Sequence, residues 1–391
     1  GAEMTCQEVR FIPVRFKDAY GPVGAWFLLF KSAATNALGE SYMQTRAGVL
    51  EEYGAYGKVK PCPANLRNYL MMLDVMEGKG PIYMQTAEAI QRIAASEDDP
   101  KKAKKKLKEL EAEAWEDFLD MTISQAILWA ATNIQPEEQP SEIAAAEPYF
   151  IGSHSGASGA WVSGPEDLAP PEYFWGYEQM TTVQGLFAAG DASGASSHKF
   201  SSGSHAEGRI TGKAAIRFLV NENPAHGNVD GATIEEMKAT CLKPMVVFEE
   251  NKDRTTQTDV NPEYIVPKMF MMRLQKLMDE YAGGVTAQFC TSEPNLLKAL
   301  ENLELLHEDS EKLGAENLHQ LMRAWENVHR SYQAEAHVRA MLFREESRWP
   351  GYYFRSDKPK MEADWECFVN SVYDAKTKEW TMKKVPITTI V

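Results

Sequence analysis

The sequence predicts an α/β fold with an additional helical part, and three observations lead to this class. Apolar residues at 186–189 end on Gly190 and Asp191, and a Gly/Ser-rich loop then leads into a helical pattern, which is the strand-to-helix order of α/β folds. Apolar residues also recur with helical spacing over much of the last third of the chain. Finally, 391 residues with 44% hydrophobic content exceed what one core usually organises, so we expect two or three domains.

The first part of the chain predicts a short strand followed by several helices. Residues 1–11 are typical of the end of one domain, and the alternating pattern at 11–16 predicts a strand that leaves it. Helical spacing over 64–91 is broken at 78–81 by Gly and Pro. Acidic residues and Pro100 then begin a long amphipathic helix, whose lysine run indicates a solvated face rather than a docking patch.

The second part predicts a connection, one long helix and a mainly helical end. Residues 135–148 are rich in Pro and Glu and indicate an exposed connection. A helix is expected over 204–220. Two apolar stripes predict antiparallel packed helices: Leu296, Leu297, Leu300, Leu303 and Leu306 form the first, and Leu318, Leu321, Trp325 and Val328 form the second.

Charge and cysteine content argue against several classes of function. A formal net charge of −15 disfavours nucleic acid as a partner, because phosphate binding requires a basic surface. The longest apolar run, near residues 23–30, is too short to span a membrane. The five cysteines form no C-x-x-C pair, so they do not predict a zinc or iron–sulfur site, and they fit buried, reduced thiols in a cytoplasmic protein.

The segment from 185 to 212 predicts a cradle for a cofactor. Asp191 would lie at the carboxyl end of a strand, where its carboxylate can accept hydrogen bonds from ribose or ribitol hydroxyls. Gly194 and Gly203 would let the backbone approach a flat ligand, and the following helix would direct its positive N-terminal end at that ligand. A tight turn capped by serine is the alternative interpretation of the same residues.

The particular residues of this segment favour the cofactor interpretation over the capped turn. HKFSSGSHAEGRI, at residues 198–210, resembles the second flavin-contacting segment of the fumarate reductase/succinate dehydrogenase flavoprotein family, in the form found in alpha subunits of dissimilatory adenylylsulfate reductases. The resemblance extends from GAEMTCQEVRFIPVRFKDAYGPVGAWFLLFK near the start to ESRWPGYYFRSDKP near the end. It implies part of an FAD-binding Rossmann-like domain, an α+β capping domain and a C-terminal helical domain. The corresponding segments are residues 1–11 and 148–240 for the FAD domain, 12–147 for the capping domain and 241–391 for the helical domain.

One expected motif is missing from the sequence. No G-x-G-x-x-G follows an opening strand, although that fingerprint normally holds the pyrophosphate of a dinucleotide. We therefore expect the chain to be an internal piece of a longer subunit. We also expect that it cannot hold FAD well by itself, and tight stoichiometric binding of FAD by the purified chain would refute this expectation.

The resemblance implies substrate-binding residues in two segments. Arg15, in an R-F-K-D segment, matches a substrate-facing arginine of the family, whereas the sequence by itself favours a salt bridge, for example with Asp18. Phe27 and Leu28 fall where the family packs apolar side chains around the adenine, and capping-domain core is their alternative role. His154 aligns with a histidine that contacts the substrate carboxylate in fumarate reductases. The residues that follow it depart from the His-Thr-Met-Gly-Gly wording, which puts dicarboxylate chemistry in doubt.

The resemblance also implies cofactor contacts near the start of the predicted helix. Asp191, Ser204, His205 and Ala206 would bind FAD non-covalently, and the last two would approach the pyrimidine end of the flavin. A backbone N–H or an imidazole there could stabilise the anionic reduced ring. His198 and His205 lie on either side of the loop, and spacing does not separate their roles from that of His154.

The implied reaction is the reduction of adenylylsulfate to sulfite and AMP through a flavin N5–sulfite adduct, or the reverse reaction in sulfur oxidation. Arg15 and His154 would neutralise and orient the anionic substrate. Electrons would come from a separate iron–sulfur beta subunit in an alpha–beta heterodimer, which links any membrane electron donor only indirectly. The alternatives are another flavoprotein of this class that acts on a dicarboxylate or an amino acid, and a non-catalytic helical scaffold.

Overall fold

The computed structural model describes residues 1–9, 14–17, 23, 34–60, 62–121, 123–145, 158–195, 201–225, 227, 229–254, 261–284, 286–348 and 354–388. The chain divides into two compact units. Unit 1 comprises Gly1–Phe11, Tyr149–Arg348 and Tyr353–Val391, and unit 2 comprises Ile12–Pro148 and Trp349–Tyr352. The four predicted domain segments remain a prediction.

Unit 2 contains an antiparallel sheet in the order β2 (Val14–Phe16), β5 (Ser141–Ala145), β4 (Ile82–Met84) and β3 (Ala34–Thr35). The predicted strand at 11–16 is therefore observed over its last three residues. Side chains alternate across a strand, so one face of this sheet is apolar and the other is polar. The buried residues of the apolar face are Val14, Phe16, Ala34, Ile82, Met84, Ser141 and Ile143.

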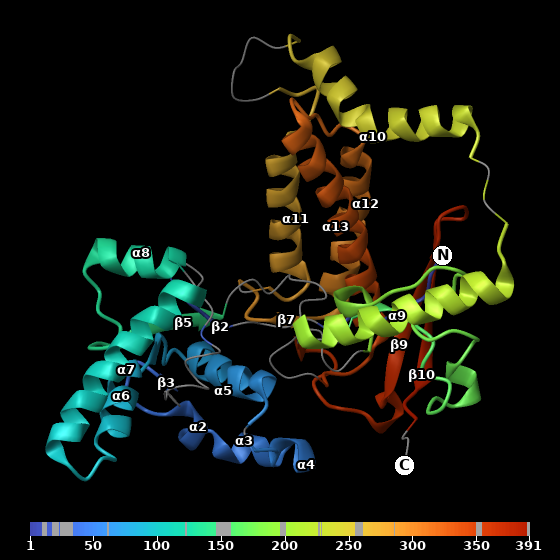
Figure 1. Ribbon diagram of the computed structural model, residues 1–391. Helices are drawn as coiled ribbons and strands as arrows, with labels where there is room; N and C mark the ends of the chain where they lie inside the picture. Colours follow the sequence, from blue (N-terminus) through green and yellow to red (C-terminus); the bar gives the residue numbers. More distant parts are fainter. Residues whose placement is uncertain are drawn as a thin grey trace. The chain divides into compact units, whose positions relative to one another are not determined.

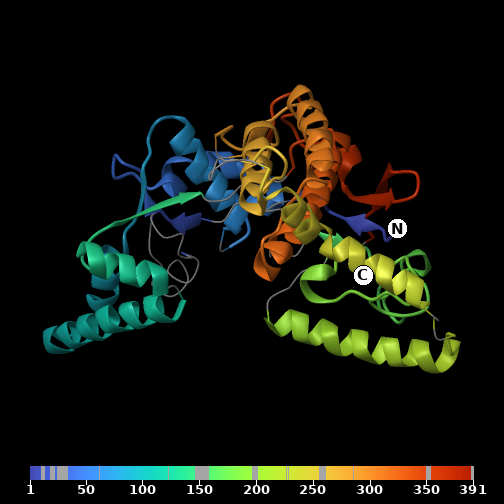
Figure 2. The ribbon, with the colours of Figure 1, turned by 90° about the horizontal axis from the view of Figure 1, so that it is seen from above.

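Unit 2 also contains helices, and aromatic rings join two of them to each other and to β2. Phe16 of β2 contacts Trp129 edge-on with ring centroids 4.9 Å apart, and Trp115 lies 6.4 Å from Trp129. Such edge-to-face pairs are favourable beyond the area they bury. The helices are α2 (Tyr42–Thr45), α3 (Ala47–Glu51), α4 (Gly54–Gly57), α5 (Ala64–Met76), α6 (Thr86–Ala94), α7 (Pro100–Met121) and α8 (Ile123–Thr132), of which α7 and α8 lie side by side (Figure 2).

Several predictions for unit 2 are confirmed. The break at 78–81 separates α5 from α6, and it also leads into β4, which the sequence analysis did not predict. Helix α7 begins at Pro100, where the Asp99 side chain accepts a hydrogen bond from the Lys101 N–H at 2.8 Å. The lysine run is solvated: Lys105 is 80% exposed and pairs with Glu109 one turn later.

Unit 1 contains a second antiparallel sheet in the order β10 (Glu379–Pro386), β9 (Cys367–Asp374), β1 (Met4–Thr5) and β6 (Gly159–Ala160). The first residues of the chain thus pair with residues near its end (Figure 1). A short parallel pair, β7 (Cys290–Thr291) and β8 (Phe354–Arg355), lies elsewhere in the unit. The sequence analysis predicted a mainly helical end and missed the β9–β10 hairpin. Its β10 strand has mostly exposed and half-buried residues and therefore lacks a continuous apolar signal.

The helices of unit 1 are α9 (Ser201–Glu222), α10 (Gly231–Asn251), α11 (Pro267–Tyr281), α12 (Glu293–Ser310) and α13 (Leu318–Phe343). Asp230 caps α10 by accepting from the Thr233 N–H, and Asn317 caps α13 by accepting from the Gln320 N–H. Helices α12 and α13 pack against each other, as predicted from the two stripes, and α11, which the stripes did not predict, packs against both (Figure 1).

The two stripes are only partly correct. In α12, Leu296, Leu303 and Leu306 are buried, but Leu297 is 50% exposed because it lies on the opposite side of the helix. In α13 the buried face is not the predicted one. Leu318 is 72% exposed, and the buried positions are mostly small or polar residues, together with Val338 and Met341: Ala324, Asn327, Ser331, Ala334, Glu335, Ala336, His337, Val338, Ala340 and Met341. A search for large apolar residues could not identify such a face.

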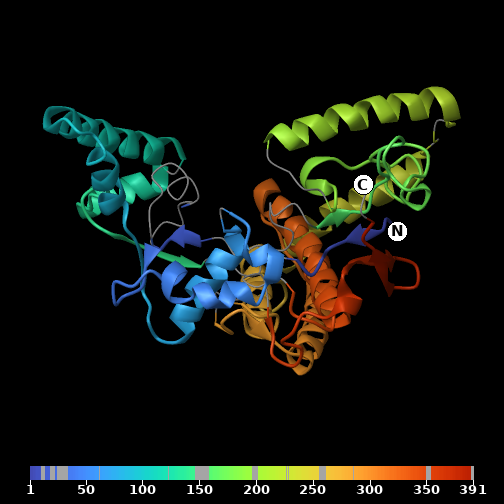
Figure 3. The same ribbon diagram turned by 90° about the horizontal axis from the view of Figure 1, so that it is seen from below.

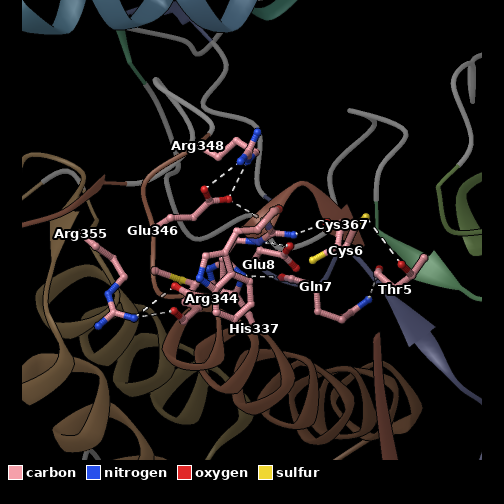
Figure 4. Close-up of polar contacts among 12 residues, drawn as sticks. Thr5, Cys6, Gln7, Glu8, His337, Arg344, Glu346, Arg348, Arg355 and Cys367 are labelled. Carbon is pink, nitrogen blue, oxygen red and sulfur yellow. Dashed lines mark hydrogen bonds and ion pairs between the residues drawn. The ribbon is translucent and has the colours of Figure 1, made fainter. Parts of the chain in front are cut away.

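A buried ionic network joins the first residues to the end of α13 (Figure 4). The Arg344 guanidinium, 1% exposed, donates to Glu8 and to Glu346 at 2.8 Å each, and both carboxylates are fully buried. Arg344 also donates to the Trp365 and Cys367 carbonyls, while Arg348 donates to Glu346 at 2.6 Å. His337 donates from Nδ1 to the Gln7 carbonyl at 2.7 Å. These contacts fix Gln7 and Glu8 against the C-terminal end of α13, and Arg344 links this point to residues 365–367.

The thiols and the helices give two further results. All five cysteines are free, as expected. The prediction of buried thiols holds for Cys6 alone: Cys241 is exposed, and the other three are half-buried. None of the described helices combines the length and the apolar character needed to cross a membrane.

Candidate functional site

The predicted cofactor segment forms a tight turn packed on α9. The short 3-10 helix η2 (Gly190–Ala192) is held to α9 because the Gly190 N–H donates to the Glu207 carboxylate at 2.7 Å. On the other side of the turn, the Gly194 N–H donates to the Ala160 carbonyl at 2.7 Å, and Ser193 forms an isolated parallel β-bridge with Ala160. Asp191 is exposed at this turn. Figure 3 shows α9 alongside the loops that contain the Gly190 turn.

The predicted strand at 186–189 is not a regular strand. It is part of an irregular hairpin in which only Phe187 forms a bridge, to Met180. Gly185 and Gly190 stand on either side of these residues with φ angles of 80° and 63°. Because the chain turns at both glycines, the strand pairing cannot extend further. The turn still places Asp191 next to the start of α9, so the predicted neighbourhood is correct although the element is not.

Gly194 allows close packing within unit 1. A Cβ atom at Gly194 would lie 2.3 Å from Thr5 Cγ2 and 2.7 Å from the Gly159 carbonyl oxygen. The missing side chain therefore lets these segments of unit 1 pack closely, and the approach of a ligand to the Gly194 backbone stays a prediction.

Helix α9 begins at Ser201, close to the predicted start, and carries three predicted cofactor residues in its first turns. Ser204 is half-buried against Gly190, whereas His205 and Ala206 are exposed. The first N–H groups of a helix have no intrahelical acceptor, so this end offers donors and a positive partial charge. Gly190, directly before Asp191, packs against Ser204, so the turn that carries Asp191 lies against the first turns of α9.

A cavity of about 330 Å³ borders the Gly190 turn. Ser193, Gly194 and Ala195 form one of its sides, and its polar groups include Ser163, whose backbone N–H donates to the Met180 carbonyl. Its aromatic walls are joined in a cluster, with Trp161 5.8 Å from Tyr173 and 5.4 Å from Phe368 by ring centroids.

Arg15 lies in unit 2 on the polar face of the four-stranded sheet. It is half-buried in the middle of β2, opposite Ala144 of β5, and both of its neighbours in the strand are buried on the other face. Over the described residues no ion pair of Arg15 is found, and Asp18 lies outside them. Lys17 pairs instead with Glu142, at 2.8 Å and 2.9 Å from its two carboxylate oxygens.

Several predicted residues cannot be placed. Phe27, Leu28, His154 and His198 lie outside the described residues. Sequence reasoning in turn missed Glu207, which holds the Gly190 turn, and no local signal distinguishes this glutamate from other helical ones. Glu142, the partner of Lys17, was missed as well. The strand period of two would have placed Lys17 on the face of Arg15, but it does not indicate which residue pairs with Lys17.

Comparison with known proteins gives the relationship. No protein-family model matches the chain. The sequence is 48% identical over 401 residues to the adenylylsulfate reductase alpha subunit of Megalodesulfovibrio gigas, covering 100% of this chain and 59% of that protein. A structure of adenylylsulfate reductase from Archaeoglobus fulgidus and a structure of adenosine-5-phosphosulfate reductase with covalently bound sulfite each superpose with a TM-score of 0.94 and 56% identity, covering 100% of this chain and 60% of theirs.

The chain is a homologue of adenylylsulfate reductase alpha subunits. The recognition made from HKFSSGSHAEGRI is therefore confirmed, and so is the mixed α/β fold class. The chain spans about 60% of the length of the adenylylsulfate reductase subunits that it matches.

The Gly190 turn of this adenylylsulfate reductase homologue allows a stability test. We expect Gly190→Ala to destabilise unit 1 by about 1–3 kcal/mol, because alanine at positive φ is strained. Its Cβ would also lie 2.9 Å from Ser204 Oγ. Urea unfolding of the purified chain measures the loss.

Gly208→Ala is the matched control for that substitution. This glycine is inside α9 with no atom within 4 Å of an added Cβ. Alanine should therefore stabilise the helix by about 0.5–1 kcal/mol. Equal effects of the two substitutions would show that the turn is not constrained as described.

Proposed function

We propose that the full-length protein reduces adenylylsulfate to sulfite and AMP, or catalyses the reverse reaction. The observation that carries this proposal is the match to adenylylsulfate reductases over 100% of this chain at 56% identity, which includes a complex with sulfite. The order of the elements, with β2 and the Gly190 turn in the expected places, supports it.

We propose FAD as the cofactor, bound non-covalently by Asp191, Ser204, His205 and Ala206. The residues fit this group: an exposed carboxylate suits ribitol hydroxyls, and the N-terminal end of α9 suits the electron-rich edge of a flavin. When bound, FAD would supply the two electrons of the reduction. Glu207 would hold the Gly190 turn, and therefore Asp191, in place.

Arg15, Phe27, Leu28 and His154 are proposed to bind the substrate, with Arg15 and His154 neutralising its anionic groups. The net charge of −15 makes such local cations necessary, because the overall field repels an anion. The half-buried position of Arg15 between two buried neighbours would hold its guanidinium in a defined direction. Phe27 and Leu28 would contact the adenine.

The partner is proposed to be an iron–sulfur beta subunit. The relative's designation as a subunit alpha supports a partner. Among the described residues, no group of three or more His, Cys, Asp or Glu side chains is arranged to hold a metal ion, which favours electron entry from another chain. Free cysteines favour a cytoplasmic location.

Product analysis tests the proposal. The full-length alpha subunit, co-expressed with its partner and supplied with an electron donor, should release sulfite and AMP in equal amounts from adenylylsulfate. AMP without sulfite would indicate simple hydrolysis and would contradict the proposal.

A further inference from the structure

The polar face of the sheet in unit 2 carries two charged residues besides Arg15, namely Lys17 and Glu142. Arg15 is opposite Ala144 in β5, and Glu142, two residues before Ala144, shares the same face because side chains alternate along a strand. The backbone N–H of Lys17 donates to the Glu142 carbonyl at 3.2 Å, and its ammonium contacts the Glu142 carboxylate. On the far side of Glu142, Tyr83 of β4 is its register partner.

The opposite face fixes this arrangement. Phe16, 1% exposed, separates Arg15 from Lys17 in the chain and packs on Trp129. Ile143, 2% exposed, separates Glu142 from Ala144. A shift by one residue would expose both apolar side chains and bury the charges, so the register holds the three charged residues on one face.

The described charged residues on this face, Arg15, Lys17 and Glu142, carry one net positive charge. Arg15 and Lys17 are two residues apart on one strand, which places their Cα atoms about 7 Å apart. Glu142 removes the contribution of Lys17, which would otherwise add to the positive potential around Arg15. The side chains of Lys17 and Glu142 are 53% and 28% exposed, so their influence is screened but not abolished.

We propose that Glu142 sets the affinity of the Arg15 site for anionic ligands by neutralising Lys17. The face then presents one net positive charge instead of two, which limits how tightly an anionic nucleotide is held and favours its release after reaction. This inference rests on the proposed role of Arg15 in binding the substrate. Lys17 and Glu142 act through the electrostatic potential around Arg15, and neither is assigned a contact with the substrate.

The expected effect is modest and has a defined sign. At separations of about 7–10 Å in a largely aqueous setting, one unit charge changes the binding energy by roughly 0.5–1 kcal/mol. That energy corresponds to a change of about threefold in a dissociation constant. Glu142→Gln should tighten binding, and Lys17→Met should weaken it because the Glu142 carboxylate then acts uncompensated.

The experiment measures AMP binding to the full-length complex by calorimetry for the wild type, Glu142→Gln, Lys17→Met and the double variant. We expect about threefold tighter, threefold weaker and near wild-type binding, respectively, with differences that shrink as salt is raised. Adenosine, which lacks the phosphate, is the matched control ligand and should show no such pattern. General damage to the sheet weakens binding and cannot produce the gain expected for Glu142→Gln.

Two other outcomes are distinguishable. If the wild type binds AMP but Glu142→Gln binds it no more tightly, the role of Glu142 is refuted while the proposed function stands. If the wild type binds neither AMP nor adenylylsulfate, the proposed function fails and this inference fails with it.

Discussion

Arg344→Met is expected to destabilise unit 1 by about 3–5 kcal/mol, because it leaves the buried carboxylate of Glu8 without its counter-charge. Glu8 loses its ion-pair partner at 2.8 Å, while Glu346 keeps Arg348. Urea unfolding of the purified chain measures the loss, and hydrogen exchange at residues 1–9 shows whether this segment is released first.

Two variants control that result. Arg330→Met removes an arginine from α13, the helix that Arg344 directly follows. The Arg330 side chain is 45% exposed and 3.9 Å from Glu326, so its loss should cost less than about 1 kcal/mol. Glu8→Gln combined with Arg344→Met should recover part of the loss, because the unpaired charge is removed. A loss for Arg344→Met no larger than that for Arg330→Met would contradict the described network.

The pH dependence of the same variant follows from Glu8. Burial raises the pKa of the Glu8 carboxyl above its ordinary value of 4.5, and Arg344 opposes that rise. Removing Arg344 should therefore raise the pKa further. A raised folded-state pKa contributes stability below the unfolded pKa that is lost as pH rises through the folded pKa, so the deficit of Arg344→Met should be smallest in acid and should grow toward neutral pH.

Arg15→Ala is expected to lower kcat/KM for adenylylsulfate in the full-length complex by roughly 30-fold or more, since removing one partner of a hydrogen-bonded charge pair costs about 2–5 kcal/mol. Arg15→Lys should retain part of the activity, because a point charge replaces the planar fork of donors. Lys105→Ala, in the same unit with a side chain 80% exposed, is the control and should act as the wild type. A loss below threefold for Arg15→Ala would refute its role.

The local patterns of the sequence predicted much of the fold. The alternation around Arg15 gave β2, the Gly/Pro break gave the end of α5, and Pro100 gave the start of α7. These features depend on neighbouring residues, so they can be read without tertiary information. The buried face of α13 and the hairpin at 367–386 could not be predicted in this way. Both depend on packing against partners distant in the chain, and neither carries a continuous apolar pattern.

The candidate site was predicted in part for the same reason. Asp191 and Ser204 were assigned to one cofactor segment, and the turn that carries Asp191 packs through Gly190 against Ser204. Glu207 was missed because its role depends on a backbone N–H 17 residues earlier in the chain. Glu142 was missed because its pairing with Lys17 joins strands separated by 125 residues.

The measurement that tests the central claim most directly is the reoxidation of the reduced flavin in the full-length alpha–beta complex, mixed anaerobically with adenylylsulfate or with fumarate. We predict rapid reoxidation by adenylylsulfate with one sulfite released per flavin, and no reoxidation by fumarate. Reoxidation by fumarate without a response to adenylylsulfate would contradict the proposed function and would remove the roles assigned to Arg15 and His154.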